Sequence, residues 1–176
     1  GNDPKYLKTV ATVKHFAVHS GPEPERHVFD AVVSERDLRE TYLPHFQRGI
    51  REAGAYSLMC AYNRVGGKAA CGSDDLLGNI LRKEWGFRGF VVSDCGAIDD
   101  IYLRHKVVAT AAEAAALAVK TGTELDCGRV YPNLVDAVKR GFITEAQIDT
   151  AVTRLFLGRF KLGMFDPPEL VRYARI

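Results

Sequence analysis

Short apolar runs alternate with longer segments of helical periodicity along this chain. The apolar runs predict strands at Ala11–His19, Tyr56–Tyr62, Phe90–Val92 and Thr123–Cys127. The run Phe90–Val92 is rich in β-branched residues and lies within the glycine-bounded stretch Gly89–Ala97. An uninterrupted apolar strand of this kind is typical of a parallel sheet that helices cover.

Amphipathic segments follow the predicted strands. Their periodicity predicts helices over residues 34–54, 73–84, 110–121, 131–140 and 144–162. Ser34, with Asp37 three residues later, predicts an N-terminal cap. Pro44 predicts a kink or a break in the first helix, because proline lacks the backbone N–H of a helix interior. The stretch Asn63–Gly67 predicts a turn-rich loop.

The alternation of strands and helices predicts an α/β protein built of parallel β/α units. We expect about four such units, which would form the second, C-terminal half of a (β/α)8 TIM-like barrel. A closed barrel takes about 250 residues. The chain has 176 residues, so we expect a fragment of a larger enzyme. The alternative is an open doubly wound sheet, which would normally carry a glycine-rich phosphate loop after its first strand. Lys14-His15-Phe16 and a proline-containing loop occupy that place instead.

Composition narrows the class of protein only slightly. The formal net charge is +2, without a dense run of Lys or Arg, so nothing predicts a nucleic-acid or membrane partner. The polar N-terminus does not resemble a signal peptide. The four cysteines, Cys60, Cys71, Cys95 and Cys127, form no C-x-x-C pair and are too few for a disulfide scaffold. We therefore expect the cysteines to be small, buried hydrophobic residues, and a metal site is the less favoured alternative.

Candidate site residues lie near the ends of three predicted strands, where barrels of this type carry their active sites. These residues are Lys14 and His15, then Met59 and Tyr62, and finally Asp94. Asp94 is the candidate for the reacting carboxylate, although aspartate also commonly caps a following helix. Lys14 and His15 could instead be solvated strand-end residues, and Met59 could belong to the core.

These segments closely resemble glycoside hydrolase family 3. The resemblance rests on Lys14–His19 (Lys-His-Phe-Ala-Val-His), Val33–Leu38, Met59–Asn63, and Trp85–Phe87 leading to Val92-Ser93-Asp94. It covers nearly the whole chain in the right order. It implies that residues 1–165 are the second half of the family's N-terminal barrel domain. Residues 166–176 would begin the linker to a second α/β domain.

The resemblance also implies roles for the strand-end residues. Asp94 matches the family's nucleophile, and Lys14 and His15 match the pair that hydrogen-bonds the non-reducing sugar. Met59 and Tyr62 match residues that line the same subsite. Lys14 is expected to lower the pKa of Asp94, and Tyr62 to orient it by hydrogen bonding. Retaining glycosidases of this kind use two carboxyl groups about 5–5.5 Å apart and need no cofactor.

The acid/base residue has no match in this chain. One branch of the family carries Asp-Ser-His after its Lys-His-Phe motif, whereas this chain has Glu25-Arg26-His27. The chain is similar to the other branch, whose acid/base glutamate comes from the second domain. The first barrel half, which supplies a binding Asp and an Arg, is also expected upstream. The isolated chain should therefore lack activity, and its partners would be these missing parts and a β-linked glycoside.

Cys95 stands where many β-glucosidases of the family have tryptophan, and Ser-Asp-Cys-Gly-Ala is similar to the β-xylosidase-like members. We therefore expect a β-xylosidase, with a β-glucosidase as the alternative. A carbohydrate-binding or structural fragment without turnover is the alternative from another class. The family favours a periplasmic or secreted location, which this sequence itself does not specify.

Overall fold

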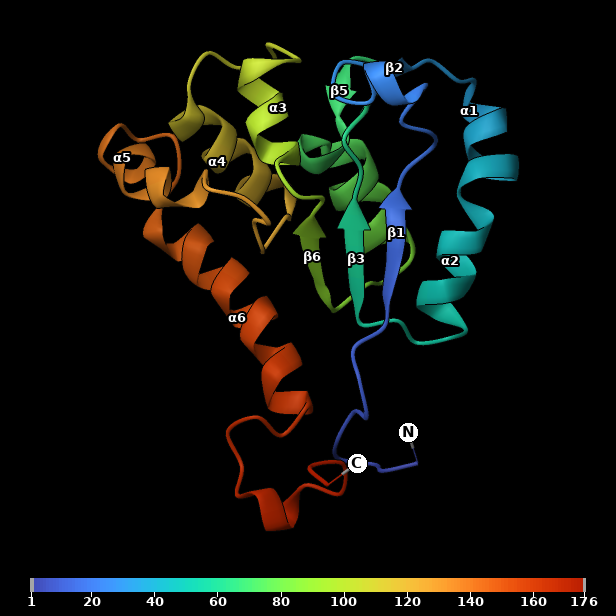
Figure 1. Cartoon of the computed structure of the whole chain (residues 1–176), viewed down its shortest axis with the longest axis vertical. Coiled ribbons are helices and arrows are strands. Elements are labelled where there is room, and N and C mark those ends of the chain that lie inside the picture. Colours follow the sequence, from blue (N-terminus) through green and yellow to red (C-terminus); the bar gives the residue numbers. More distant parts are fainter. Residues whose placement is uncertain (1, 176) are drawn as a thin grey trace.

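A parallel sheet forms the centre of the computed structural model, which describes residues 2–175 (Figure 1). Its strands are β1 (Thr12–Phe16), β3 (Ser57–Cys60) and β6 (Phe90–Ser93), in that spatial order. In the central strand, Leu58 pairs with Val13 on one side and with Val91 on the other. The strands are parallel and joined by helical connections, as the alternation of patterns predicts.

Helical segments connect these strands in order. The first connection contains α1 (Glu35–Asp37), the wider π-type turns of η2 (Leu38–Tyr42), and α2 (Pro44–Arg51). The π-type helix η4 (Asp74–Glu84) joins β3 to β6. After β6 come α3 (Ala97–Leu103), α4 (Ala111–Thr121), α5 (Leu134–Lys139) and α6 (Glu145–Lys161). Short 3-10 turns lie at η1 (Glu23–Glu25), η3 (Ala70–Gly72), η5 (Tyr131–Asn133) and η6 (Pro168–Leu170).

Local sequence signals fix several helix boundaries. The Ser34 hydroxyl accepts the backbone N–H of Asp37 at 3.0 Å, so the predicted cap is confirmed. The predicted interruption at Pro44 is also confirmed, because η2 ends just before it and α2 begins there. At the start of α4, Thr110 and Glu113 form a reciprocal capping box. Such caps satisfy N–H groups that have no partner within the helix.

Helices pack against one face of the sheet. Leu58 and Val91 are completely buried on that face, and they join Phe16 in the main apolar core. Met59 alternates with Leu58 along β3 and therefore points to the opposite face. Lys14 is exposed and Met59 is half-buried. In a closed barrel this second face lies inside the ring of strands.

Some predicted elements are wrong in extent or kind. The strand expected at Thr123–Cys127 is reduced to a single bridge between Leu125 and Val92. The loop expected at Asn63–Gly67 contains β4 (Arg64–Val65), which forms a second small sheet with β2 (Asp30–Ala31) and β5 (Lys68–Ala69). The short helix α3 was not predicted. Pairing between β2 and β4 joins residues far apart in sequence, so periodicity alone does not reveal it.

The last long helix, α6, runs from the body of the domain toward both chain ends (Figure 1). The Leu7 N–H donates to the Lys161 carbonyl at 2.7 Å, and the hydroxyl of the buried Tyr6 donates to Asp166. These bonds join the N-terminal segment to the end of the chain. Residue 1 of the predicted barrel half (1–165) and residue 176 of the predicted linker (166–176) lie outside the described residues. Between residues 2 and 175, no helix is both long and apolar enough to cross a membrane.

Candidate active site

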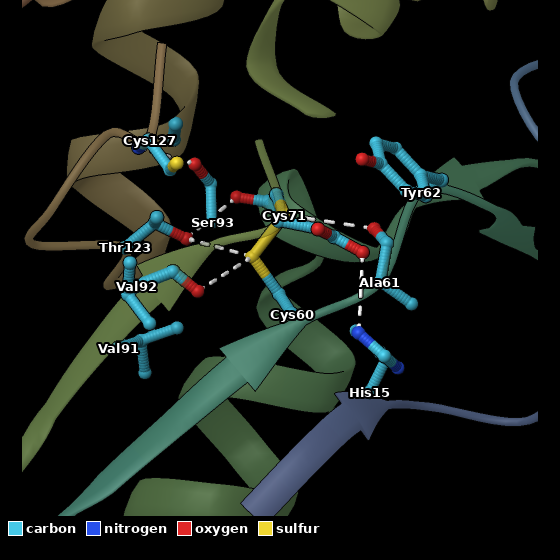
Figure 2. Close-up of a disulfide and its surroundings, with 12 residues drawn as sticks. His15, Cys60, Ala61, Tyr62, Cys71, Val91, Val92, Ser93, Thr123 and Cys127 are labelled. Atoms are coloured by element: carbon cyan, nitrogen blue, oxygen red, sulfur yellow. Dashed lines mark hydrogen bonds and ion pairs between the residues drawn. A yellow bond between two sulfur atoms is a disulfide. The ribbon is translucent and has the colours of Figure 1, made fainter. Parts of the chain in front are cut away.

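The carboxyl ends of the three strands bring His15, Tyr62 and Asp94 to one edge of the sheet. His15 lies near the end of β1, Tyr62 follows β3, and Asp94 follows β6 directly. Figure 2 shows His15 at the tip of β1 and Tyr62 beyond the tip of β3, on the same side. Parallel strands end at a common edge, so residues distant in sequence meet there.

The Asp94 carboxylate has one oxygen fixed and one facing its neighbours. Its Oδ1 accepts the Cys95 backbone N–H at 2.8 Å. Its Oδ2 lies 3.4 Å from His15 Nε2, and the side chain is 14% exposed. The Asp94 backbone N–H donates to the Cys60 carbonyl at 3.1 Å, which ties this residue to the central strand. The carboxylate is therefore held through Oδ1, while Oδ2 faces the His15 ring and the side chain as a whole is partly exposed.

The alternative role of Asp94 as a helix cap is wrong. The N-cap residue of α3 is Gly96, whose φ of 85° lies in the left-handed region that favours glycine. The Asp94 backbone carbonyl accepts the Ala97 N–H at 2.9 Å, and its side chain accepts only the Cys95 N–H, which lies before the N-cap. Its side chain thus makes no cap hydrogen bond to α3.

Tyr62 is buried beside Asp94. Its hydroxyl donates to the Cys95 carbonyl at 2.9 Å. Burial raises the pKa of Tyr62, and the nearby charge and hydrogen bonding of Asp94 raise it further. The phenol therefore stays protonated at neutral pH, and it donates its one O–H proton to the Cys95 carbonyl beside the carboxylate.

Lys14 and Met59 lie on the strands as the sequence predicts, but they are less closely connected to Asp94. Across the described residues, the ion-pair partner of Asp94 is His15 rather than Lys14. Lys14 is exposed on β1, and Met59 pairs in register with Val92 of β6. The sugar-binding roles expected for Lys14 and Met59 stay predictions.

A pocket of about 300 Å³ lies beside His15. It is lined further by Val18, His19, Ser20, Gly21, Glu23, Arg26 and Asn63. The Arg26 guanidinium carbon lies 4.6 Å from the centre of the Tyr62 ring, so this residue connects the pocket to the site. In the sequence, Glu25-Arg26-His27 only marks the place where the Asp-Ser-His acid/base signature is absent, and Arg26 was not predicted to belong to the site.

The expectation for the cysteines is wrong, because all four form disulfides. Cys60 pairs with Cys71, with Cα atoms 5.2 Å apart, and Cys95 pairs with Cys127, with Cα atoms 4.4 Å apart. Figure 2 shows the first bridge next to Ala61, just before Tyr62 in the chain. Disulfide sulfurs are not thiolate ligands, so the alternative of a cysteine metal site is also wrong. The even number of cysteines and their positions near strand ends were the sequence signal that could have predicted the two disulfides.

The Cys95–Cys127 bridge is of particular interest because Cys95 directly follows Asp94. It joins the turn after β6 to the segment after Leu125, and two hydrogen bonds reinforce the same connection. The Gly96 N–H donates to the Cys127 carbonyl at 2.7 Å, and the Cys127 N–H donates to Ser93 Oγ at 2.9 Å. The backbone on both sides of Asp94 is therefore cross-linked to the neighbouring segment.

Fold and site together define a β/α-barrel domain with an accessible carboxylate at the end of a strand, next to histidine and tyrosine. The family model described as "Glycosyl hydrolase family 3 N terminal domain" matches residues 5–157. The chain belongs to glycoside hydrolase family 3, and the predicted α/β barrel class is confirmed.

Curated relatives agree with this assignment. A xylan 1,4-beta-xylosidase of Xylanibacter ruminicola is 45% identical over 99% of this chain and 21% of its own length. A probable exo-1,4-beta-xylosidase of Aspergillus terreus is 45% identical over 100% of this chain and 24% of its own length. The chain thus spans less than a quarter of the length of these relatives.

Solved structures share the fold. A GH3 exo-beta-xylosidase in complex with a xylobiose aziridine probe aligns with a TM-score of 0.94 at 32% identity. That alignment covers 100% of this chain and 24% of the other. A beta-glucosidase from Listeria innocua in complex with glucose aligns with a TM-score of 0.80 at 30% identity, over 95% of this chain and 23% of the other.

Proposed function

We propose that this chain is the nucleophile-bearing half-barrel of a retaining exo-β-xylosidase. The observation that carries the proposal is the Asp94 carboxylate, anchored through Oδ1 and with Oδ2 beside His15. Membership of a glycoside hydrolase family, with xylosidases among the similar proteins, supports the reaction class and the sugar.

In the proposed reaction, Asp94 Oδ2 attacks the anomeric carbon of the non-reducing sugar. A bond forms between this oxygen and the carbon, and the bond to the leaving oxygen breaks, while an acid/base residue protonates that oxygen. Water then cleaves the glycosyl ester, and the same acid/base residue removes the proton from the water. The Tyr62 hydroxyl, bonded to the Cys95 carbonyl, would hold the backbone next to the carboxylate during both steps.

The sugar would be bound largely by hydrogen bonds to its hydroxyl groups. Lys14 and His15 are the proposed donors, and Met59 and Tyr62 are proposed to line the same subsite. The half-exposed imidazole of His15, 3.4 Å from the carboxylate, is placed to contact a sugar seated over Asp94. Lys14 would contact it from the exposed face of β1.

The remaining functions of the site are proposed to come from outside this chain. The acid/base glutamate would belong to a second α/β domain, whose linker begins at residues 166–176. The other barrel half would precede the half formed by residues 1–165. This chain alone should therefore not hydrolyse glycosides, because general acid catalysis typically contributes about 10²–10⁴-fold to the rate.

The relatives support a xylosidase over a glucosidase. Where many β-glucosidases of the family carry tryptophan, this chain has Cys95, which is bridged to Cys127. This changes the shape of the sugar pocket, and the relatives with high identity are named xylosidases. A β-glucosidase of the same family is the second candidate, because such enzymes share the fold. Two disulfides also favour an oxidising compartment, such as the periplasm or the extracellular space.

The test is a substrate comparison with the complete enzyme that contains this chain. Hydrolysis of aryl β-xyloside and aryl β-glucoside is measured for the wild type, for Asp94→Ala and for the exposed control Asp149→Asn. The proposal expects a higher kcat/KM for the xyloside, loss of turnover in Asp94→Ala, and normal turnover in the control. A preference for the glucoside would favour the second candidate. Binding of the sugar without any turnover would favour a binding module.

A further inference from the structure

The ring of Tyr62 is enclosed by two consecutive residues of the loop after β1. The Arg26 guanidinium carbon lies 4.6 Å from the ring centre. The imidazole of His27 meets the same ring edge to face, with centres 4.6 Å apart and planes at 64°. Contacts of both kinds favour a defined ring position. The Tyr62 hydroxyl therefore reaches the Cys95 carbonyl from a ring that the loop helps to place.

His27 is itself fixed by a buried carboxylate. Its Nδ1 lies 2.7 Å from Asp100 Oδ2, and the Asp100 side chain is only 7% exposed. Asp100 belongs to α3, the helix that begins immediately after the nucleophile turn. A buried carboxylate is costly unless it is hydrogen-bonded, so this contact is a built part of the fold. It ties the loop after β1 to the helix after β6.

The backbone of Tyr62 is anchored separately. His105 Nε2 lies 2.7 Å from the Tyr62 carbonyl oxygen, and His105 is buried. This bond holds the main chain, whereas the pair of His27 and Asp100 acts on the ring. Removing the pair should therefore loosen the phenol without releasing the strand end.

We propose that His27 and Asp100 are positioning residues for Tyr62. They keep its hydroxyl at the Cys95 carbonyl, next to the Asp94 carboxylate. The catalytic consequence rests on the proposed function, because it requires Asp94 to be the nucleophile. The contact between His27 and the Tyr62 ring does not depend on it. Loss of the pair should lower kcat more than it raises KM, since Lys14 and His15, the proposed hydrogen-bond donors to the sugar, remain.

The kinetic test is a double-mutant cycle in the complete enzyme with an aryl β-xyloside. His27→Ala should lower kcat about tenfold in the wild type but hardly at all in Tyr62→Phe, because residues that act through one group are not additive. Asp100→Asn keeps an oxygen facing His27 Nδ1 and should cost less than Asp100→Ala. The exposed histidine variant His45→Ala is the matched control and should leave kcat unchanged. Equal losses from His27→Ala in both backgrounds would overturn the proposal.

The second readout needs no turnover. In enzyme labelled with 3-fluorotyrosine, the ¹⁹F signal of Tyr62 is identified by its absence in Tyr62→Phe. This signal should shift or broaden in His27→Ala and Asp100→Asn but not in His45→Ala. An unchanged signal in both variants would overturn the proposal. This test does not need Asp100→Ala, so it still decides if that variant fails to fold. A wild type without turnover but with the expected ¹⁹F shifts would refute the proposed function and leave the positioning role supported.

Discussion

Two carboxylates on neighbouring segments of the sheet have opposite surroundings. Glu124 has a completely buried side chain, which Arg82 contacts at 2.7 Å and Arg154 at 3.1 Å. Its Oε2 also accepts the Val91 N–H at 2.7 Å, three residues before Asp94. Asp94, by contrast, is partly exposed, with one fixed oxygen and a histidine 3.4 Å from the other.

The difference separates a structural charge from the carboxylate that we propose to be reactive. Burial raises the pKa of Glu124, although Arg82, the Val91 N–H and Arg154 oppose this shift. With both oxygens bonded, this carboxylate joins η4, β6 and α6 and has no free face for a substrate. Asp94 has such a face, and an accessible carboxylate with few partners is suited to nucleophilic attack. The burial and complete pairing of Glu124 are thus typical of a structural residue, whereas the incomplete pairing of Asp94 is consistent with the proposed nucleophile.

The largest expected effect is on turnover in Asp94→Asn. The complete enzyme should lose several orders of magnitude in kcat, as enzymes do when a nucleophile is removed. Its stability should change by less than about 1 kcal/mol, since Asp94 is partly exposed and asparagine can still accept the Cys95 N–H. Aryl β-xyloside kinetics and thermal unfolding measure the two effects. A large loss of stability with only a modest loss of turnover would contradict the proposal that Asp94, unlike Glu124, has a catalytic rather than a structural role.

The reverse result is expected for Glu124→Gln. Breaking a buried ion pair typically costs about 3–5 kcal/mol, because the arginines would keep their charges without a partner. Chemical unfolding followed by near-UV circular dichroism measures this loss. The matched control is Glu52→Gln on the surface, which should have almost no effect. If both variants were equally stable, Glu124 would not be the structural charge described above.

A smaller effect is expected for the two nitrogen-bearing side chains of the site, His15 and Lys14. His15→Ala and Lys14→Ala should each lower kcat/KM about 10- to 100-fold in the complete enzyme, the size of a lost hydrogen bond to a charged group. Both variants should weaken binding of the free sugar as well, which titration calorimetry measures. A structure with bound sugar in which both side chains point away from the ligand would refute these roles.

The smallest expected effect is a pH dependence from His105. Burial lowers the pKa of this histidine, even though its hydrogen bond to the Tyr62 carbonyl favours the charged form. The unfolded chain then binds more protons than the folded one below the ordinary pKa of about 6.5, so stability falls as the pH drops from there. His105→Gln should flatten this slope by at most about 1.4 kcal/mol per pH unit. A slope unchanged from wild type, measured beside the control His45→Gln, would contradict this account.

Local patterns in the sequence predict much of this fold. The runs around Leu58 and Val91 predict the buried strands, Ser34 predicts its cap, and Pro44 predicts the break before α2. These features depend on neighbouring residues, whose periodicity and backbone chemistry can be read directly. The second small sheet cannot be read in this way, because Asp30 pairs with the distant Arg64.

The same distinction between local and long-range features applies to the site. Asp94, His15 and Tyr62 are predictable, because strand ends of a parallel barrel converge and the residues match a family motif. The disulfide of Cys95 and the contact of His27 with Tyr62 are not, since each joins loops whose approach depends on tertiary packing. Cysteine number alone did not distinguish paired from free thiols.

Covalent trapping of the glycosyl intermediate tests the central claim most directly. The complete enzyme is treated with a 2-deoxy-2-fluoro-β-xyloside that carries a good leaving group, and the digest is analysed by mass spectrometry. The account predicts a single fluoroxylosyl ester on Asp94, absent from Asp94→Asn. A label on another carboxylate, or turnover of the reagent with no ester on any residue, would contradict the assignment of Asp94 as the nucleophile.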